Sequence, residues 1–444
     1  MNKCKYAIVG TGARVVAFLD PIVGEYRDVS SLVGLCDTSP TRMGFHTKRI
    51  ANAYGAPAPA TYLASDFDQM LRDRRPDVVV VCTPDSSHHD YIIRALRHGC
   101  DVISEKPMTT DADKCQAIFE AVRETGRKVT VTFNCRWIPG PAKLREVLAS
   151  GVIGRVHQVS CEYFLNTSHG SDYFRRWHSD RAVSGGLLVH KSTHHFDLLN
   201  WWIDDIPELV FADGGLFFYG KENAVARGRE DLTTYDRYTG IAAAKSDPFR
   251  YDLAGDERLA ALYLDAERDG GYVRDKNVFR PGINIEDVMT VMIRYRGGTL
   301  ATYSLNAFSP VEGMNVTLTG DNGRIEYRER KSQQALDADG KITVDTSGGY
   351  GMELRVMPLF APSYDVPIDR AEGSHGGGDA LIRRQLFSRE PRHDSLGCLA
   401  GHEQGAASLL IGAAANESIA SGKRISISSL CPLPAEARRF QDLI

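Results

Sequence analysis

The first 137 residues alternate short apolar segments with helical patterns, and this alternation restricts the possible fold more than any other feature of the chain. The apolar segments are continuous runs rich in valine and isoleucine, as in Val78–Cys82. Runs of this kind fit strands that are buried on both faces of a parallel sheet, with helices as the crossover connections. The pattern predicts a doubly wound α/β domain over residues 1–137, with strands at 6–9, 31–36, 78–82, 102–104 and 129–133.

The remainder of the chain, residues 138–444, has a different texture. Its longer β-type runs, one of them interrupted by an Asp-Asn-Gly turn, predict an antiparallel sheet. Helical patterns towards the C-terminus make this half an α+β domain. We expect β-runs at 156–165 and 286–330 with the turn at 321–323, helices at 376–388 and 396–421, and an insertion of unspecified structure at 221–282.

The composition argues against several classes of partner. The net charge is −4 with both signs interspersed, which disfavours nucleic acid or an anionic membrane. The nine cysteines form no C-x-x-C pair, and several interrupt apolar runs, which favours free thiols in a reducing compartment. The first strand starts close to Met1 and no apolar run is long enough to span a bilayer, so we expect a cytoplasmic protein.

A glycine-containing turn, Gly10-Thr11-Gly12-Ala13-Arg14, follows the first predicted strand and precedes a helix. The two glycines permit a tight turn and let the backbone approach a pyrophosphate at the helix N-terminus, although Val15 replaces the third glycine of G-x-G-x-x-G. Asp37 ends the second predicted strand, where a carboxylate can accept both ribose hydroxyls. Because this carboxylate repels a 2′-phosphate, the sequence favours NAD over NADP, while Arg42 could offset the repulsion.

Two further strand ends place polar residues at the same edge of the sheet, where open α/β folds bind their ligands. Thr83-Pro84 follows one strand and is expected on the nicotinamide side; His88 is either a ribose neighbour or a cap of the next helix. Glu105-Lys106-Pro107 follows the next strand. Oxidation of a carbinol by hydride transfer also releases the hydroxyl proton, and a lysine with a lowered pKa can accept it. Lys106 is therefore the predicted base.

These residues together resemble the Gfo/Idh/MocA family of NAD(P)-dependent oxidoreductases. The resemblance continues through Asn134 and Arg136, Gly185-Gly186, the segment His194–Asp197 and the segment Gly320–Glu326, and it covers most of the chain except 221–282. It implies an open, mainly antiparallel sheet in the second domain that also mediates homo-oligomers, a lysine that assists proton transfer, and sugar or cyclitol substrates. The predicted cofactor residues are Gly10, Gly12, Ala13, Arg14, Asp37, Thr83, Pro84, His88, Glu105, Lys106 and Asn134.

The segment Leu187–Asp197 carries three histidines. On a helix, positions 190, 194 and 197 share one face, which puts two imidazoles in reach of one substrate. The family usually has an acidic residue four positions before the histidine, and here His190 replaces it. The predicted catalytic residues are Lys106, His190, Lys191 and His194, whereas His195 is assigned a packing or hydrogen-bonding role.

The histidine segment allows more than one chemistry. A metal site is not expected, because His190 and His194 lack the accompanying glutamate of H-E-x-x-H. A histidine pair beside Lys191 suits additional acid–base work or an anionic substrate. In this respect the chain resembles the NAD-dependent glycosidases of the same superfamily, which also carry an element similar to His375-Gly376-Gly377-Gly378-Asp379.

Five residues are candidates for substrate contacts, although aromatic side chains are usually core residues and His375 could equally mark a flexible helix start. They are Arg136, Tyr163, Trp177, His178 and His375.

Three functions are compatible with these patterns. The first is an NAD-dependent dehydrogenase acting on a ring hydroxyl of a sugar or glycoside. The second is a glycoside hydrolase in which NAD transiently oxidises the ring, a glycosidic group is eliminated, water adds and the hydride returns. The third is a non-catalytic sensor of NAD and a sugar, which would have no reason to retain Lys106 together with the histidines.

Overall fold

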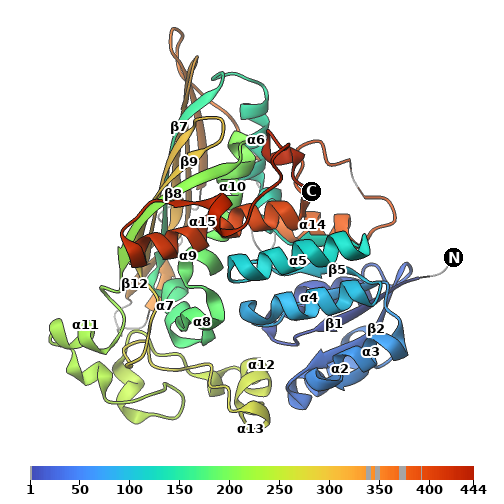
Figure 1. The fold of residues 1–444 in the computed structure, drawn as a ribbon. Coiled ribbons are helices and arrows are strands. Elements are labelled where there is room, and N and C mark those ends of the chain that lie inside the picture. Colours follow the sequence, from blue (N-terminus) through green and yellow to red (C-terminus); the bar gives the residue numbers. More distant parts are fainter. Residues whose placement is uncertain (1–2, 337–341, 346–350, 370–376, 392) are drawn as a thin grey trace.

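The computed structural model describes residues 3–444 except 337–341, 346–350, 370–376 and 392, and it forms two sheets connected by helices (Figure 1). The N-terminal sheet has the strand order β3-β2-β1-β4-β5-β6, all parallel, with the short β16 (Ala400–Gly401) added antiparallel to β6. This is the predicted doubly wound domain. Its strands are β1 (Cys4–Val9), β2 (Ser30–Asp37), β3 (Ala60–Leu63), β4 (Val78–Val81), β5 (Asp101–Ser104) and β6 (Val129–Val131).

The five predicted strands are present, and β3 was not predicted because it is a short edge strand with no fully buried residue. The central strands are buried, as the continuous apolar runs required: Ile8, Val80 and Val81 have no exposed surface. The helices of this domain are α1 (Val16–Val23), α2 (Pro40–Tyr54), α3 (Phe67–Arg74), α4 (His88–Arg97) and α5 (Ala112–Thr125).

The second sheet has the order β15-β14-β12-β11-β7-β10-β9-β8-β17, with β13 pairing to β12. Its pairings are antiparallel apart from β10 with β7, which confirms a mainly antiparallel sheet. The predicted turn lies between Gly320 and Gly323, which pair across β11 and β12. The strands are β7 (Val156–Asn166), β8 (Pro207–Gly215), β9 (Val288–Tyr295), β10 (Leu300–Ser309), β11 (Val311–Gly320), β12 (Gly323–Leu336), β13 (Ile342–Asp345), β14 (Gly351–Pro358), β15 (Tyr364–Asp365) and β17 (Ile425–Ser426).

A long helix, α15 (His402–Ser421), connects the two halves of the molecule: it packs on β8 and also contacts α5 and β6 of the N-terminal domain (Figure 1). Gly422 ends it in the left-handed region, as the sequence predicted. None of the helices in the described part of the chain has both the length and the apolar character needed to cross a membrane. The remaining helices of this half include α6 (Pro139–Ala149), α7 (Thr167–Arg175), α8 (Arg181–Ser184), α9 (Leu187–His190), α10 (Thr193–Ile203), α14 (Gly378–Phe387) and α16 (Ile427–Leu430).

The insertion at 221–282 consists of short helices and irregular connections, among them α11 (Lys221–Ala226), α12 (Glu257–Leu259) and α13 (Glu267–Gly270). It extends from the second sheet towards α2 of the N-terminal domain (Figure 1). The insertion therefore lies against the N-terminal domain. Its polar sequence did not predict this contact.

Candidate active site

A cavity of about 1340 Å³ lies where the carboxyl ends of β1, β2, β4 and β5 face the second domain. Seventeen of the predicted catalytic, cofactor and substrate residues line it, and they come from both domains. They are Gly10, Gly12, Ala13, Arg14, Asp37, Thr83, Pro84, His88, Glu105, Lys106, Asn134, Tyr163, Trp177, His178, His190, Lys191 and His194.

The glycine turn has the geometry of a dinucleotide cradle. Gly10 adopts φ +87°, and a Cβ at this position would meet the Cys82 backbone at 2.5 Å. A side chain is therefore excluded both by conformation and by space. One carboxylate oxygen of Asp37 accepts hydrogen bonds from the Thr11 amide at 2.5 Å and the Thr11 hydroxyl at 2.8 Å. The turn at the start of α1 and the carboxylate at the end of β2 fit a dinucleotide.

Arg14 turns away from this cradle to hold other groups of the site. Its Nε donates to Glu105 Oε1 at 2.6 Å, and its Nη1 lies 3.7 Å from Asp379 Oδ2. Asn134 donates to Asp379 at 2.9 Å. Asp379 belongs to the H-G-G-x-D-like element, whose His375 lies outside the described residues. Arg14 therefore holds the loop that carries Glu105 and Lys106, and Arg14 and Asn134 together hold Asp379.

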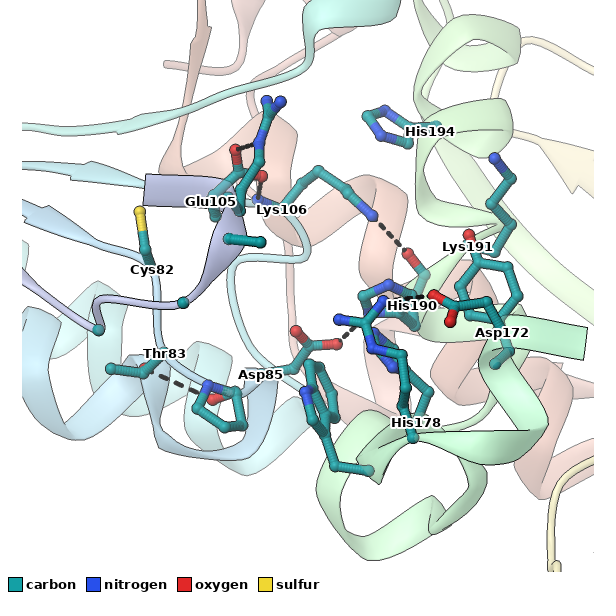
Figure 2. A pocket seen from close by; sticks show the side chains of 18 of the residues that line it. Cys82, Thr83, Asp85, Glu105, Lys106, Asp172, His178, His190, Lys191 and His194 are labelled. Atoms are coloured by element: carbon teal, nitrogen blue, oxygen red, sulfur yellow. Dashed lines mark hydrogen bonds and ion pairs between the residues drawn. The ribbon is translucent and has the colours of Figure 1, made fainter. Parts of the chain in front are cut away.

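Lys106 points to the second domain, and its Nζ donates to the backbone oxygen of His190 at 3.1 Å (Figure 2). Burial lowers the pKa of Lys106 to about 8, although the nearby carboxylates of Asp85 and Glu105 act in the opposite direction. A neutral amine is therefore accessible near physiological pH, as a proton acceptor requires.

His88 holds the two loops of this wall together. Its ring nitrogens lie 2.9 Å from Pro107 O and 2.8 Å from Thr83 O. The side chain is buried, and burial lowers its pKa. Both ring nitrogens thus contact backbone oxygens, so His88 positions the loops that carry Thr83 and Lys106. Its side chain also lines the cavity.

Asp85 and His190 form a buried pair across the two domains (Figure 2), with 2.5 Å between Oδ2 and Nδ1. Burial raises the pKa of Asp85. Burial, followed by the charge of Lys106, lowers the pKa of His190. Both shifts disfavour the charged form of the group, and the short contact joins the two side chains across the domain boundary. His178 packs edge-on to His190 at 4.2 Å between ring centroids, and Trp177 stacks on His178 at 3.6 Å.

The histidine segment is not one helix. α9 ends at His190 and α10 begins at Thr193, so the expectation that positions 190, 194 and 197 share a helix face is wrong. His190 and His194 both line the cavity, but Asp197 is fully buried. His195 stacks on Tyr163 at 3.9 Å, and its Nδ1 lies 2.7 Å from the Tyr303 hydroxyl.

Arg136, expected to contact a substrate, lies outside the cavity. It is completely buried and forms a two-bond ion pair with Asp197, at 2.8 Å from Nε and 2.5 Å from Nη2. Its remaining Nη1 donates to Gln404 at 2.8 Å and Gly397 O at 3.1 Å. This is a correction: the side chain that the sequence placed at the domain boundary joins that boundary to α10 and α15.

Several cavity residues were missed by sequence reasoning. Asp85 directly follows Thr83-Pro84, and its place after a strand end was the available signal. The others come from scattered positions whose proximity only the fold reveals. They are His169, Asp172, Tyr173, Arg176, Tyr263, Tyr272, Arg274, Glu312, Glu329 and Lys331.

The acidic residues, histidines and cysteines of the described ranges form no group of three or more that could hold a metal ion. His169 is instead engaged with Glu312, at 3.0 Å from its Nδ1. This contact lowers the pKa of Glu312, against the raising effect of burial.

Two family models match this chain along most of its length. Residues 4–133 match the oxidoreductase family with an NAD-binding Rossmann fold, and residues 145–427 match the C-terminal alpha/beta domain of the same family, Gfo/Idh/MocA.

Individual relatives agree with the family match. The oxidoreductase YteT of Bacillus subtilis is 34% identical over 93% of this chain and 95% of its own length. Inositol 2-dehydrogenase of Rhizobium meliloti is 30% identical over 41% of this chain and 50% of its own. Among solved structures, the aldose-aldose oxidoreductase of Caulobacter crescentus has the same fold, with a TM-score of 0.60 and 19% identity over 96% of this chain and 100% of that chain.

Proposed function

This chain belongs to the Gfo/Idh/MocA family of oxidoreductases, and we propose that it is an NAD-dependent enzyme that removes a hydride from a ring carbinol of a sugar or glycoside. The observation that carries the proposal is the position of Lys106. Its buried amine lies 3.1 Å from the backbone of His190, in the cavity lined by the glycine turn and Asp37.

The residues of this chain account for the proton that leaves with the hydride. NAD, when bound, supplies the hydride acceptor. Lys106, with a pKa of about 8, takes the hydroxyl proton of the carbinol. The Asp85–His190 pair, adjacent to Lys106, orients that hydroxyl through the imidazole.

The cavity walls favour a substrate rich in hydroxyl groups. Tyr163, Trp177, Glu312 and Lys331 combine ring faces with hydrogen-bonding groups, which is the usual way in which proteins bind small polar ligands. Inositol 2-dehydrogenase, a relative by sequence, is named for oxidation of a polyhydroxylated ring. Lys191 and Lys331 lie 5.1 Å and 5.6 Å from the Tyr163 ring centroid, so an anionic substituent on the sugar suits this end of the cavity.

A second candidate is the redox-neutral glycoside hydrolase, and the Asp85–His190 pair favours it. After oxidation of a ring carbon to a ketone, the neighbouring C–H becomes acidic and needs a base, while the leaving glycosidic oxygen needs an acid. Lys106 alone serves one proton transfer at a time. The His190 imidazole, oriented by the Asp85 carboxyl group, and Lys191, next to it in the chain, supply the additional groups.

One experiment separates these functions. Purified protein is incubated with NAD and a panel of free sugars and aryl glycosides, and NADH absorbance and aglycone release are followed together. The proposal expects NADH to accumulate with the substrate. Aglycone release without net NADH, with solvent deuterium entering beside the oxidised carbon, would replace the dehydrogenase with the hydrolase.

The Asp85→Asn variant extends the comparison. If the hydrolase is correct, this change should slow aglycone release more than NADH formation in a single turnover, because elimination needs the oriented imidazole. NADH binding with neither signal on any sugar would contradict both enzymes and favour a sensor.

A further inference from the structure

The insertion, residues 221–282, contacts the N-terminal domain at the part of the fold that binds the adenosine half of a dinucleotide. One contact is made by Tyr263, whose hydroxyl accepts a hydrogen bond from the Ala13 amide of the glycine turn at 3.0 Å. A second is made by α13 at the start of α2, the helix that follows Asp37. The insertion is therefore part of the wall of the cofactor site.

The contact at α2 centres on Asp269. Its Oδ2 accepts hydrogen bonds from the Ser39 hydroxyl and from the Thr41 amide, the latter at 3.0 Å. The Ser39 hydroxyl lowers the pKa of Asp269, so the carboxylate is charged at neutral pH. A carboxylate at a helix N-terminus also interacts favourably with the helix dipole.

The same few residues connect Asp269 to Asp37. The Ser39 amide donates to Asp37 Oδ1 at 2.9 Å, while the Ser39 hydroxyl donates to Asp269. Arg42 Nη2 donates to the same Asp37 oxygen at 2.9 Å. Two carboxylates, one from β2 and one from the insertion, thus flank Ser39 on opposite sides.

This arrangement occupies two uncharged donors that a 2′-phosphate would use, the Ser39 hydroxyl and the Thr41 amide. The ribose hydroxyls of a dinucleotide lie beside the acid that ends β2, so a 2′-phosphate would project towards the residues that follow it. The available donors there are the Ser39 hydroxyl, the Thr41 amide and the Arg42 guanidinium. The first two donate to Asp269, and Nη2 of the third donates to Asp37, while the Arg42 Nε has no hydrogen-bond partner among the described residues.

A second cation beside this position is Arg268, whose Nε and Nη2 lie 3.3 Å and 3.2 Å from the Thr41 hydroxyl. With Arg42 it balances the two carboxylates, so net charge alone does not decide between NAD and NADP. The Ser39 hydroxyl and the Thr41 amide do distinguish the two cofactors. A 2′-phosphate would have to displace the Asp269 carboxylate from both of these donors.

We propose that Asp269 is a determinant of cofactor choice, and that the insertion uses it to exclude dinucleotides with a 2′-phosphate from the N-terminus of α2. This inference rests on the proposed function only in that the cavity binds a nicotinamide dinucleotide; it does not depend on the substrate. Asp37 and Asp269 then act together. Asp37 accepts hydrogen bonds from the ribose hydroxyls, and Asp269 excludes a phosphate from the position next to them.

The test measures the dissociation constants of NADH and NADPH by nicotinamide fluorescence, without any sugar. The ratio of the NADPH to the NADH constant is compared among wild type, Asp269→Ala, Asp269→Asn and Asp265→Ala. Asp265→Ala is the matched control, because it removes the same charge from an exposed position of the same insertion. Asp269→Asn removes the charge but retains an acceptor oxygen for Ser39 and Thr41.

We expect Asp269→Ala to lower the ratio of the NADPH to the NADH dissociation constant by about tenfold or more. The 2′-phosphate then accepts hydrogen bonds from the Ser39 hydroxyl and the Thr41 amide and is attracted by Arg42 and Arg268. Asp269→Asn should have a smaller effect, and Asp265→Ala should leave the ratio as in wild type.

An unchanged ratio in Asp269→Ala, with NADH still bound, would overturn the inference but not the proposed function. Equal weakening of both dinucleotides would also overturn it, because the insertion would then only retain the cofactor. NADH bound tightly by a protein that oxidises no sugar would contradict the proposed function alone.

Discussion

At the scale of single residues, burial acts on three neighbouring groups in a way that makes proton transfer possible near neutral pH. Burial penalises whichever form is charged, so it lowers the pKa of Lys106 and of His190 and raises that of Asp85. The opposite signs follow from the opposite charges of the groups. Three groups with shifted pKa values thus line one cavity, which is typical of sites that transfer protons.

If Lys106 is the base, the rate of oxidation should rise with pH. The base is active when neutral, and the neutral fraction grows as pH rises through the pKa of about 8. The rate of oxidation should therefore be low at pH 6, rise through pH 8 and level off above it, as measured by kcat with saturating substrate and NAD.

The Lys106→Met variant should lower kcat by about 100-fold or more while NADH binding is retained, because it removes the proton acceptor and leaves the glycine turn intact. Lys106→Arg is the matched control for charge, since it restores a cation that cannot act as a base near neutral pH. A flat pH profile, or turnover retained in Lys106→Met, would contradict this role.

At the scale of elements, the sequence predicted what depends on local periodicity. Strands β1, β2, β4, β5 and β6 of the N-terminal sheet, the turn at 321–323 and the end of α15 at Gly422 follow from apolar runs and turn residues. The partnership of Asp85 with His190 was not predictable in this way, because the two residues lie 105 positions apart on different domains. The break between α9 and α10 and the docking of the insertion on α2 also depend on tertiary contacts.

The buried pair of Arg136 and Asp197 joins the turn after β6 to α10, and this role can be tested by stability. Arg136→Met should lower the apparent free energy of unfolding by about 3 kcal/mol, because it leaves the Asp197 carboxylate buried without its partner. The measurement is urea denaturation followed by tryptophan fluorescence.

A matched control is Arg97→Met, which breaks an exposed ion pair with Glu124 and should cost less than about 1 kcal/mol. The double variant Arg136→Met with Asp197→Leu should recover part of the loss, since no charge is then left unpaired. If Arg136→Met were as stable as wild type but bound substrate poorly, the sequence-based assignment of Arg136 to the substrate would be restored.

At the scale of the whole molecule, the described residues cover the large sheet on one face only. Along β9 the residues Met289, Val291, Ile293 and Tyr295 are buried, and the intervening residues are exposed. α15 packs on β8, and Tyr163 of β7 and Glu312 of β11 line the active-site cavity on this covered side (Figure 1). The opposite face therefore points away from the active site.

The uncovered face carries apolar side chains that are adjacent in the sheet. Met292 pairs with Phe211 of β8 on one side and with Thr302 of β10 on the other. Met292 is 56% exposed and Phe211 37% exposed. Two adjacent exposed apolar side chains on an uncovered sheet face are a candidate contact for another molecule, and in a two-fold dimer that molecule is a second copy of this chain.

We therefore expect this chain to form a dimer or a tetramer through the uncovered face, and Met292→Lys to shift it towards the monomer, because two buried ammonium groups would face each other across a two-fold interface. Sedimentation velocity at several protein concentrations measures the shift.

Val225→Lys is the control, since Val225 is a similarly exposed apolar residue on α11, away from the sheet. NADH binding should be unchanged in both variants, because the active-site cavity lies on the opposite side of the sheet from Met292. A wild-type protein that sediments as a monomer at all concentrations, or a Met292→Lys variant that associates as well as wild type, would exclude this face as the interface.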